Sequence, residues 1–276
     1  MSRHRAALPL SISVTCFMAR FRFTLEYEGT RYSGWQVQKN ARTVQGELIG
    51  ALATVLGTRD FEFMGSGRTD AGVHALYQVA HLEASTMLAP HVMRMKLNDI
   101  LPADVNILGI EKAQPRFHAR HNAVSRSYIY QICRRRTAFG KRYVWWIKDE
   151  LDVRAMHAAC AVFEGFHDFR SFTRDDPDEK STTVELQKCR MIEAGPMLVI
   201  NIQGSHFLWK MVRQMVGIIA EVGRGAMKPD HVRELLRRSS SLPAVKTAPP
   251  SGLFLHHVRY SNDEPEADVV PTLLIP

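Results

Sequence analysis

The segment Gly65–Ala75 places one carboxylate, Asp70, and one guanidinium, Arg68, in the glycine-rich stretch GSGRTDAGVHA. Apolar, strand-like sequence lies on both sides, with FEFM before it and LYQVAHLE after it. A lone carboxylate in such a loop can act as a nucleophile or as a general base. It can also cap backbone N–H groups of a hairpin turn, as turn aspartates often do. The loop alone favours the cap, so any chemistry must be argued from the rest of the chain.

Phosphate-binding motifs are excluded at this loop. GSGRTD begins like a dinucleotide fingerprint, but Asp70 occupies the position where the motif needs its last glycine. A strand pattern follows, whereas the fingerprint needs a helix N-terminus to receive the pyrophosphate. No Gly-Lys-Ser/Thr follows either, which excludes a Walker loop. We therefore expect no nucleotide cofactor.

The cysteines and histidines show no metal-ligand spacing. No CxxC, Cys-His cluster or HExxH motif occurs, although the chain contains 12 histidines. We expect no metal site. The four cysteines are far apart and are expected to be free thiols in a reducing compartment: Cys16, Cys133, Cys160 and Cys189.

The composition is that of a globular protein with a polyanionic partner. Of the 276 residues, 45% are hydrophobic and 23% are charged, and the formal net charge is +8. This positive excess favours binding to a polyanion without identifying it. No apolar run approaches the roughly 20 residues of a membrane span. Residues 1–17 precede a second methionine, Met18, and we expect them to be a dispensable extension.

Hydrophobic periodicity in the first half predicts four strands and two helices. Their order, β-α-β-β-α-β, is the split ferredoxin-like arrangement. The expected elements are Phe21–Tyr27, Val44–Leu56, Phe61–Met64, Leu76–Glu83, Pro90–Ile100 and Val105–Ile110.

The same order recurs in the second half, with one additional helix. Asp152 is expected to cap the first helix of this half, which runs to about Phe163. The other expected elements are Ser127–Cys133, Val184–Ile192, Leu198–Ile202, Phe207–Val222, Pro229–Arg238 and Leu253–Tyr260.

These patterns predict an α+β fold with two ferredoxin-like, RRM-like halves. The first half covers residues 18–121, the second covers 122–261, and residues 262–276 form a tail. We expect the two antiparallel sheets to join edge to edge into one wide platform. Related sheets bind single-stranded RNA by stacking bases on aromatic side chains.

Three other candidates have ordinary structural interpretations. Tyr128 and Tyr130 share a strand face, where packing is the usual role. The helix expected over Phe207–Val222 carries Arg213 on its polar face, and charge patterning favours a solvated face. The loop YEGTRYSGWQVQ could bind substrate or simply pack Trp35 at a strand end.

The motifs taken together resemble one family. YEGTRYSGWQVQ, GRTDAGVHA, FHAR, RSYIY, HDFRSF, FLWKMVRQMVG and PPSGLFLHHVRY occur in this order. The set resembles the tRNA pseudouridine synthase A family over roughly residues 20 to 260. GRTDAGVHA followed by MVRQMVG at this separation is the most specific part.

The resemblance implies a reaction and its residues. It implies isomerisation of uridine to pseudouridine in the anticodon stem-loop of tRNA, at positions 38 to 40, without a cofactor. Asp70 matches the catalytic aspartate, as nucleophile or base, and Arg213 is the cation that pairs with it. Tyr128 is expected to stack on the target uracil and to assist proton transfer. Leu253 is expected to form an apolar wall of the same pocket.

The resemblance also implies a central RNA-binding cleft on this platform, RNA contacts and an assembly. Arg68 is expected to meet the RNA within the site. Arg31, Arg120 and Arg126 are expected to contact the RNA backbone, although the last two could also belong to a basic linker. The expected partners are tRNA and a second copy of the chain in a homodimer, located in the cytoplasm.

Two other functional classes remain open from the sequence. An RNA-binding protein or chaperone could use the same platform without catalysis, and it would tolerate loss of Asp70. A pseudouridine synthase with another RNA specificity would have the same catalytic residues, so only substrate mapping separates it. A metabolic enzyme with a small-molecule substrate is disfavoured because no cofactor or phosphate motif exists.

Overall fold

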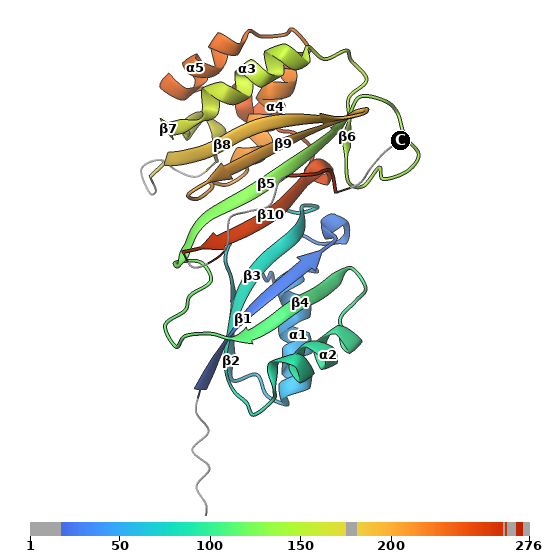
Figure 1. Cartoon of the computed structure of the whole chain (residues 1–276), viewed down its shortest axis with the longest axis vertical. Coiled ribbons are helices and arrows are strands. Elements are labelled where there is room, and N and C mark those ends of the chain that lie inside the picture. The colour runs from blue at the N-terminus through green and yellow to red at the C-terminus, as the bar shows by residue number, and fades with distance from the viewer. Residues whose placement is uncertain (1–17, 175–180, 262, 264–268, 273–276) are drawn as a thin grey trace, which may run out of the picture.

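The fold is mixed α+β, built on one large sheet. A computed structural model describes residues 18–174, 181–261, 263 and 269–272. The expected extension over residues 1–17 and most of the expected tail lie outside these described residues. Figure 1 shows the sheet running the length of the molecule, with α3, α4 and α5 near one end and α1 and α2 near the other.

The sheet has ten strands in the described residues. Along its main path the order is β4-β1-β3-β10-β5-β9-β8-β7, while β2 pairs with β3 and β6 pairs with β5. The strands are β1 Met18–Tyr27, β2 Phe61–Gly65, β3 His74–Ser85, β4 Val105–Lys112, β5 Ala123–Cys133, β6 Trp145–Trp146, β7 Gly165–Asp168, β8 Thr183–Ala194, β9 Met197–Gly204 and β10 Leu253–Tyr260.

Strand β10 lies in the middle of the sheet, between β3 and β5. It pairs antiparallel with β5, and its first residues pair in parallel with the start of β3. Phe254 lies opposite His74, four residues after Asp70 in the chain. A strand from the end of the sequence therefore runs directly beside the loop that carries the candidate carboxylate.

The described chain contains six α-helices. Thr43 caps the first one through its side chain, and Gly57 ends it in the left-handed conformation. Asp152 accepts a hydrogen bond of 2.9 Å from the Ala155 N–H and caps α3, as the sequence predicts. The helices are α1 Val44–Leu56, α2 Pro90–Ile100, α3 Val153–Phe163, α4 Met211–Gly223, α5 Pro229–Arg237 and α6 Leu242–Val245.

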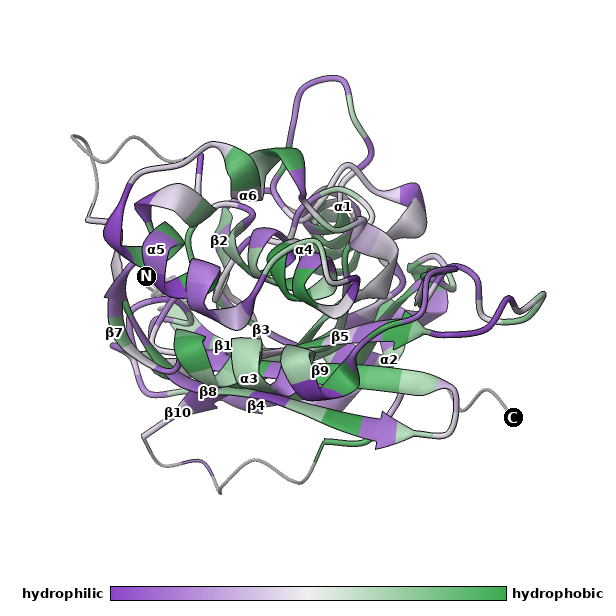
Figure 2. Cartoon of the chain, turned by 90° about the horizontal axis from the view of Figure 1, so that it is seen from above, coloured by the Kyte–Doolittle hydropathy of each residue, from purple (hydrophilic) through white to green (hydrophobic). Residues whose placement is uncertain are grey.

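Two large apolar clusters form the core. One gathers side chains mainly from β5, β8, β9, α3 and α4, and the other gathers them mainly from β1, β3, α1 and α2. Hydrophobic colouring covers much of α4 in Figure 2, whereas α5 is largely hydrophilic. Tyr128 packs against both clusters, which places it where the two parts of the core meet.

The expected start of α4 is wrong by one turn. The sequence predicts a helix from Phe207, but α4 begins at Met211, because Lys210 has a φ of 62°. A residue in the left-handed region interrupts a right-handed helix. Short elements at β6, β7 and α6 were also not predicted. Across the described residues, no helix combines the length and the apolar character needed to cross a membrane.

Candidate active site

Asp70 lies in the loop between β2 and β3, and hydrogen bonds on both sides fix this loop. The Tyr27 hydroxyl and Thr69 Oγ1 are 2.8 Å apart, and the backbone N–H of Trp35 donates to the Thr69 carbonyl oxygen at 3.1 Å. At the start of the loop, the Ser66 hydroxyl donates to Gln78 Oε1 at 2.7 Å. The carboxylate is therefore presented by an ordered loop.

The segment after β1 supports this loop at close range. A Cβ atom on Gly29 would overlap the Val73 carbonyl oxygen, and one on Gly34 would lie 2.6 Å from the Thr69 carbonyl oxygen. Gly34 also has a φ of 95°, which only glycine adopts readily. Trp35 is buried and packs beside Tyr27, with the two rings tilted and their centroids 5.9 Å apart. Of the two interpretations of YEGTRYSGWQVQ, packing accounts for its tryptophan and its glycines.

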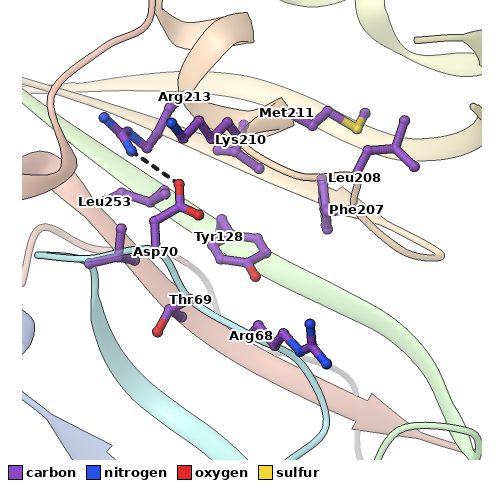
Figure 3. A pocket seen from close by; sticks show the side chains of 12 residues that line it. Arg68, Thr69, Asp70, Tyr128, Phe207, Leu208, Lys210, Met211, Arg213 and Leu253 are labelled. Carbon is purple, nitrogen blue, oxygen red and sulfur yellow. Dashed lines mark hydrogen bonds and ion pairs between the residues drawn. The ribbon is translucent and has the colours of Figure 1, made fainter. Parts of the chain in front are cut away.

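Arg213 from α4 forms an ion pair with Asp70. Its Nη1 lies 3.0 Å from Asp70 Oδ2, and its Nε donates to the Ala248 carbonyl oxygen at 2.8 Å. The two side chains are only 14% and 20% exposed. Figure 3 shows both pointing toward each other across the pocket.

The environment of α4 excludes a solvated basic face. Every residue of α4 except Arg213 is buried. Lys210 precedes the helix and Arg224 follows it, so Arg213 is the one cation within α4 itself. The ordinary interpretation of this helix, a basic face toward water, is therefore wrong.

The ion pair lies in a pocket with aromatic and apolar walls. Tyr128 lies between Asp70 and Phe207 in Figure 3, and its ring meets that of Phe207 edge to face with centroids 5.0 Å apart. Burial raises the pKa of Tyr128 to about 12, so its hydroxyl is neutral at physiological pH. The lining residues are Arg68, Thr69, Asp70, Val73, Tyr128, Phe207, Leu208, Lys210, Met211, Val212, Arg213 and Leu253.

Five of the expected site residues meet in this pocket, and three lie elsewhere. The five are Asp70, Arg68, Tyr128, Arg213 and Leu253. Arg31 and Arg120 are exposed outside the pocket.

Arg126 is also outside the pocket lining, and its guanidinium is committed to backbone carbonyl groups. It donates to Ser66 at 3.1 Å, to Arg120 at 2.8 Å and to Ser205 at 3.0 Å, with a longer bond to Ala123. Burial lowers the pKa of Arg126 from its ordinary value. This side chain clips the start of the Asp70 loop to the linker before β5 and to the end of β9.

Sequence reasoning missed the part of the pocket formed just before α4. Phe207, Leu208 and Lys210 line the pocket because the chain turns at Lys210 instead of continuing as a helix. If these residues were helical, as the sequence predicts, their side chains would be distributed over the faces of the helix and would not be gathered around the pocket. Nothing in FLWK signals a left-handed lysine, so the sequence offers no local sign of this arrangement.

The site combines one carboxylate, one guanidinium that pairs with it and one aromatic ring, and the ion pair is only slightly exposed to solvent. Such a carboxylate can attack an electrophilic carbon or accept a proton, while the ring can hold a planar base. Within the described residues, no three side chains of His, Cys, Asp or Glu gather where they could hold a metal ion.

A comparison with protein families identifies the class. The family model described as tRNA pseudouridine synthase matches residues 24–122 and 159–261. Because these two segments cover more than half of the sequence, the chain belongs to the tRNA pseudouridine synthase family, whose members isomerise uridine to pseudouridine.

Individual relatives agree with this assignment. A tRNA pseudouridine synthase A from Maridesulfovibrio salexigens is 37% identical over 247 residues, covering 88% of this chain and 91% of the relative. A protein of the same name from Geobacter sp. strain M21 is 38% identical and is covered to 99%. Among solved structures, a Cbf5-Nop10-Gar1 complex matches 74% of this chain and 45% of that chain, at 12% identity and a TM-score of 0.36. That likeness is too low to support an argument.

Proposed function

We propose that this protein converts uridine to pseudouridine in the anticodon stem-loop of tRNA, at positions 38 to 40, with Asp70 as the catalytic group. The observation that carries the proposal is the Asp70–Arg213 ion pair of 3.0 Å inside a pocket walled by Tyr128 and Leu253. The family membership and the names of the relatives support the same reaction and substrate.

The reaction is an isomerisation whose atoms balance without a cofactor. The bond between C1′ of the ribose and N1 of uracil breaks, the base turns within the pocket, and a bond forms between C1′ and C5. N1 gains a proton and C5 loses one. Asp70 can start this sequence by attacking C1′ as a nucleophile or by removing the proton at C2′ as a base.

Arg213 and Tyr128 have complementary roles in the proposal. A guanidinium 3.0 Å away favours the charged carboxylate over its acid, and either route needs the charged form. Tyr128 stacks on the uracil while it is detached and turned, and its neutral hydroxyl lies near C5 when that proton leaves. Leu253 limits the space in which the base can move.

The target nucleotide must leave the RNA stack to reach Asp70. Extruding a base costs a few kcal/mol, which protein contacts to the RNA must offset. The net charge of +8 favours contacts to phosphates. In this proposal Arg68, which lines the pocket, contacts the RNA there, and the exposed Arg31 and Arg120 contact its backbone. Arg126 acts by positioning the loop, because backbone carbonyl groups occupy its donors.

We further propose that the sheet consists of two ferredoxin-like halves, with residues 18–121 as one and 122–261 as the other. The strand order β4-β1-β3 with β2 on β3, and β10-β5-β9-β8, supports this division. By resemblance to the family, two copies form a homodimer that binds tRNA across both, and the substrate places it in the cytoplasm. Size-exclusion chromatography with light scattering tests the dimer.

Mapping pseudouridine in tRNA tests the proposed function. Cells that lack this protein should lose pseudouridine at positions 38 to 40, and expression of the wild-type chain should restore it. Loss of pseudouridine in another RNA instead would assign the enzyme a different specificity. An unchanged pseudouridine map would contradict the proposal and favour an RNA-binding role without catalysis.

A further inference from the structure

Residues 246–252 form a strap that lies against α4 and leads to the pocket, and it contacts Arg213 and the loop that carries Asp70. The strap leads into β10, whose first residue, Leu253, lines the pocket. We propose that the strap is a positioning element that sets the orientation of Arg213 toward Asp70. The activity measurements that test this inference rest on the proposed function, whereas the structural measurement does not.

The strap bonds to Arg213 at two points. The Ala248 N–H donates to the Arg213 carbonyl oxygen at 3.0 Å, and Arg213 Nε donates to the Ala248 carbonyl oxygen at 2.8 Å. A guanidinium is planar, with its donors in a fixed fork. Fixing the direction of Nε therefore fixes the direction of Nη1, which donates to Asp70 at 3.0 Å. A shift of the strap would turn the guanidinium away from the carboxylate.

The position of the strap on α4 is fixed by a glycine and an ion pair. A Cβ atom on Gly217 would overlap the Lys246 carbonyl oxygen, so only glycine allows this approach. One turn further along the helix, Lys246 Nζ lies 2.7 Å from Glu221 Oε2. The nearby Lys246 and Arg224 lower the pKa of Glu221 despite its burial, so this carboxylate stays charged at neutral pH.

The far end of the strap is fixed by β5 and touches the Asp70 loop. The Tyr130 hydroxyl donates to the Pro249 carbonyl oxygen at 2.8 Å. A Cβ atom on Gly252 would lie 2.7 Å from the Gln131 carbonyl oxygen, which shows how closely the strap follows the strand. Pro250 packs against Gly72, two residues after Asp70. One short segment thus touches the guanidinium, the loop of the carboxylate and the pocket wall.

Two variants move the strap without touching the ion pair. Gly217→Ala forces the strap away from α4, and Tyr130→Phe removes only the hydroxyl that holds Pro249. Displacing a catalytic group by about 1 Å can cost on the order of 100-fold in rate. We expect turnover of bound tRNA to fall about 100-fold for Gly217→Ala and about 10-fold for Tyr130→Phe, with the Kd for tRNA within about twofold of wild type.

A double-mutant comparison separates positioning from general damage. If the strap acts through Arg213, each variant should cost little further turnover in an Arg213→Lys background, because coupled residues are not additive. Val232→Ala, in the buried face of α5, is the control for a loss of packing remote from the pocket. The proposal would be overturned if the loss of turnover in each strap variant multiplied fully with the loss caused by Arg213→Lys. It would also be overturned if that loss were no larger than the loss in Val232→Ala at the same Tm.

A crystal structure of Tyr130→Phe, and of Gly217→Ala if it folds, tests the inference without an activity assay. We expect the distance from Arg213 Nη1 to Asp70 Oδ2 to exceed 4 Å in at least the glycine variant. An unchanged ion pair beside a displaced strap would overturn it. If the wild-type enzyme shows no turnover on tRNA, the proposed function fails while this structural outcome still decides the role of the strap.

Discussion

Arg213 Nη1 and Asp70 Oδ2 lie 3.0 Å apart, although the two residues are separated by 143 positions in the chain. Each comes from a different part of the fold, the carboxylate from the loop between β2 and β3 and the guanidinium from α4. All other residues of α4 are buried, so the helix presents a single charge at the pocket. The ion pair is therefore a product of the tertiary fold and is absent from either segment alone.

We predict that Arg213→Lys lowers turnover without a matching loss of tRNA affinity. Lysine keeps the charge but lacks the planar fork, so it cannot donate to Ala248 and to Asp70 in the same geometry. Turnover of bound tRNA should fall about 100-fold or more. Single-turnover kinetics with enzyme in excess measures this effect separately from binding.

The control for Arg213→Lys is the same substitution at Arg233. That guanidinium pairs with Asp230 on the exposed surface of α5, outside the pocket lining. It should change turnover by less than about twofold. Equal losses at the two positions would show that the role assigned to the Asp70 pair is mistaken.

Replacing Tyr128 should separate binding from turnover. Tyr128→Leu keeps bulk but removes the ring and the hydroxyl, so the detached uracil is no longer held. The Kd for whole tRNA should change by less than about threefold, because one base among many contacts is lost, while turnover should fall by at least about 100-fold. Both should be measured at one salt concentration.

Tyr77→Leu gives the matched control, because Tyr77 is half-buried on β3 and packs against His257 outside the pocket lining. It should leave turnover near the wild-type value. A Tyr128→Leu variant with weak binding but intact turnover of bound tRNA would make Tyr128 a docking residue.

Substitutions at Arg126 and at Arg120 should have opposite effects, one on stability alone and the other on the salt dependence of tRNA binding alone. Arg126→Lys removes the planar fork that donates to several carbonyl groups, two of them in part-buried bonds, and should reduce the free energy of unfolding by about 1–3 kcal/mol. It should leave the salt dependence of tRNA binding unchanged. Arg120→Ala removes an exposed charge and should instead reduce the slope of log affinity against log salt by about 1, at unchanged stability. Urea unfolding and a salt series of Kd values measure both, and a reversed pattern would refute the assignment.

His81 should make stability depend on pH in the acid range. Burial, with smaller effects of His118 and Arg20, lowers the pKa of His81 to about 4. In the unfolded chain the value is near 6.5, so the unfolded state takes up the proton first as pH falls. Stability is therefore complete above about pH 6.5 and is lost toward pH 4.

Between pH 7.5 and pH 5 this histidine should cost the wild type about 2 kcal/mol of unfolding free energy. The Ala119 N–H donates to His81 Nδ1, while Nε2 lies 3.8 Å from Glu62. His81→Gln can retain an acceptor for Ala119 but cannot titrate, so most of this loss should disappear. Urea unfolding at both pH values measures the change in unfolding free energy. An equal decrease in the wild type and in His81→Gln would exclude His81 as the source of the pH dependence.

Elements with local end signals could be predicted from the sequence. The bounds of α1 and α2 agree with the periodicity, since Thr43 and Gly57 mark the ends of one and Pro90 marks the start of the other. The start of α4 could not be predicted, because it depends on a lysine in the left-handed region. The parallel contact of β10 with β3 is equally invisible, as strand pairing at this separation leaves no local pattern.

Only part of the site could be predicted from the sequence. Local reasoning favours a turn cap for Asp70 and a solvated face for Arg213, and only the resemblance to a family pairs them. The role of Arg126 as a clip was not predictable, because two of its acceptors are backbone carbonyl groups from distant segments, at Ser66 and Ser205. Charge in the sequence indicates where cations are, but the fold decides which of them remain available to RNA.

The most direct test of the account is pseudouridine formation by purified Asp70→Asn on a tRNA anticodon stem-loop. Asparagine preserves the shape but can neither attack C1′ nor accept the C2′ proton. Asp60→Asn, an exposed site just before β2, controls for the loss of a carboxylate. We predict wild-type folding, a Kd for tRNA within about twofold, and turnover reduced at least about 1,000-fold for Asp70→Asn alone. Turnover by Asp70→Asn within tenfold of the wild type would contradict the catalytic role of Asp70.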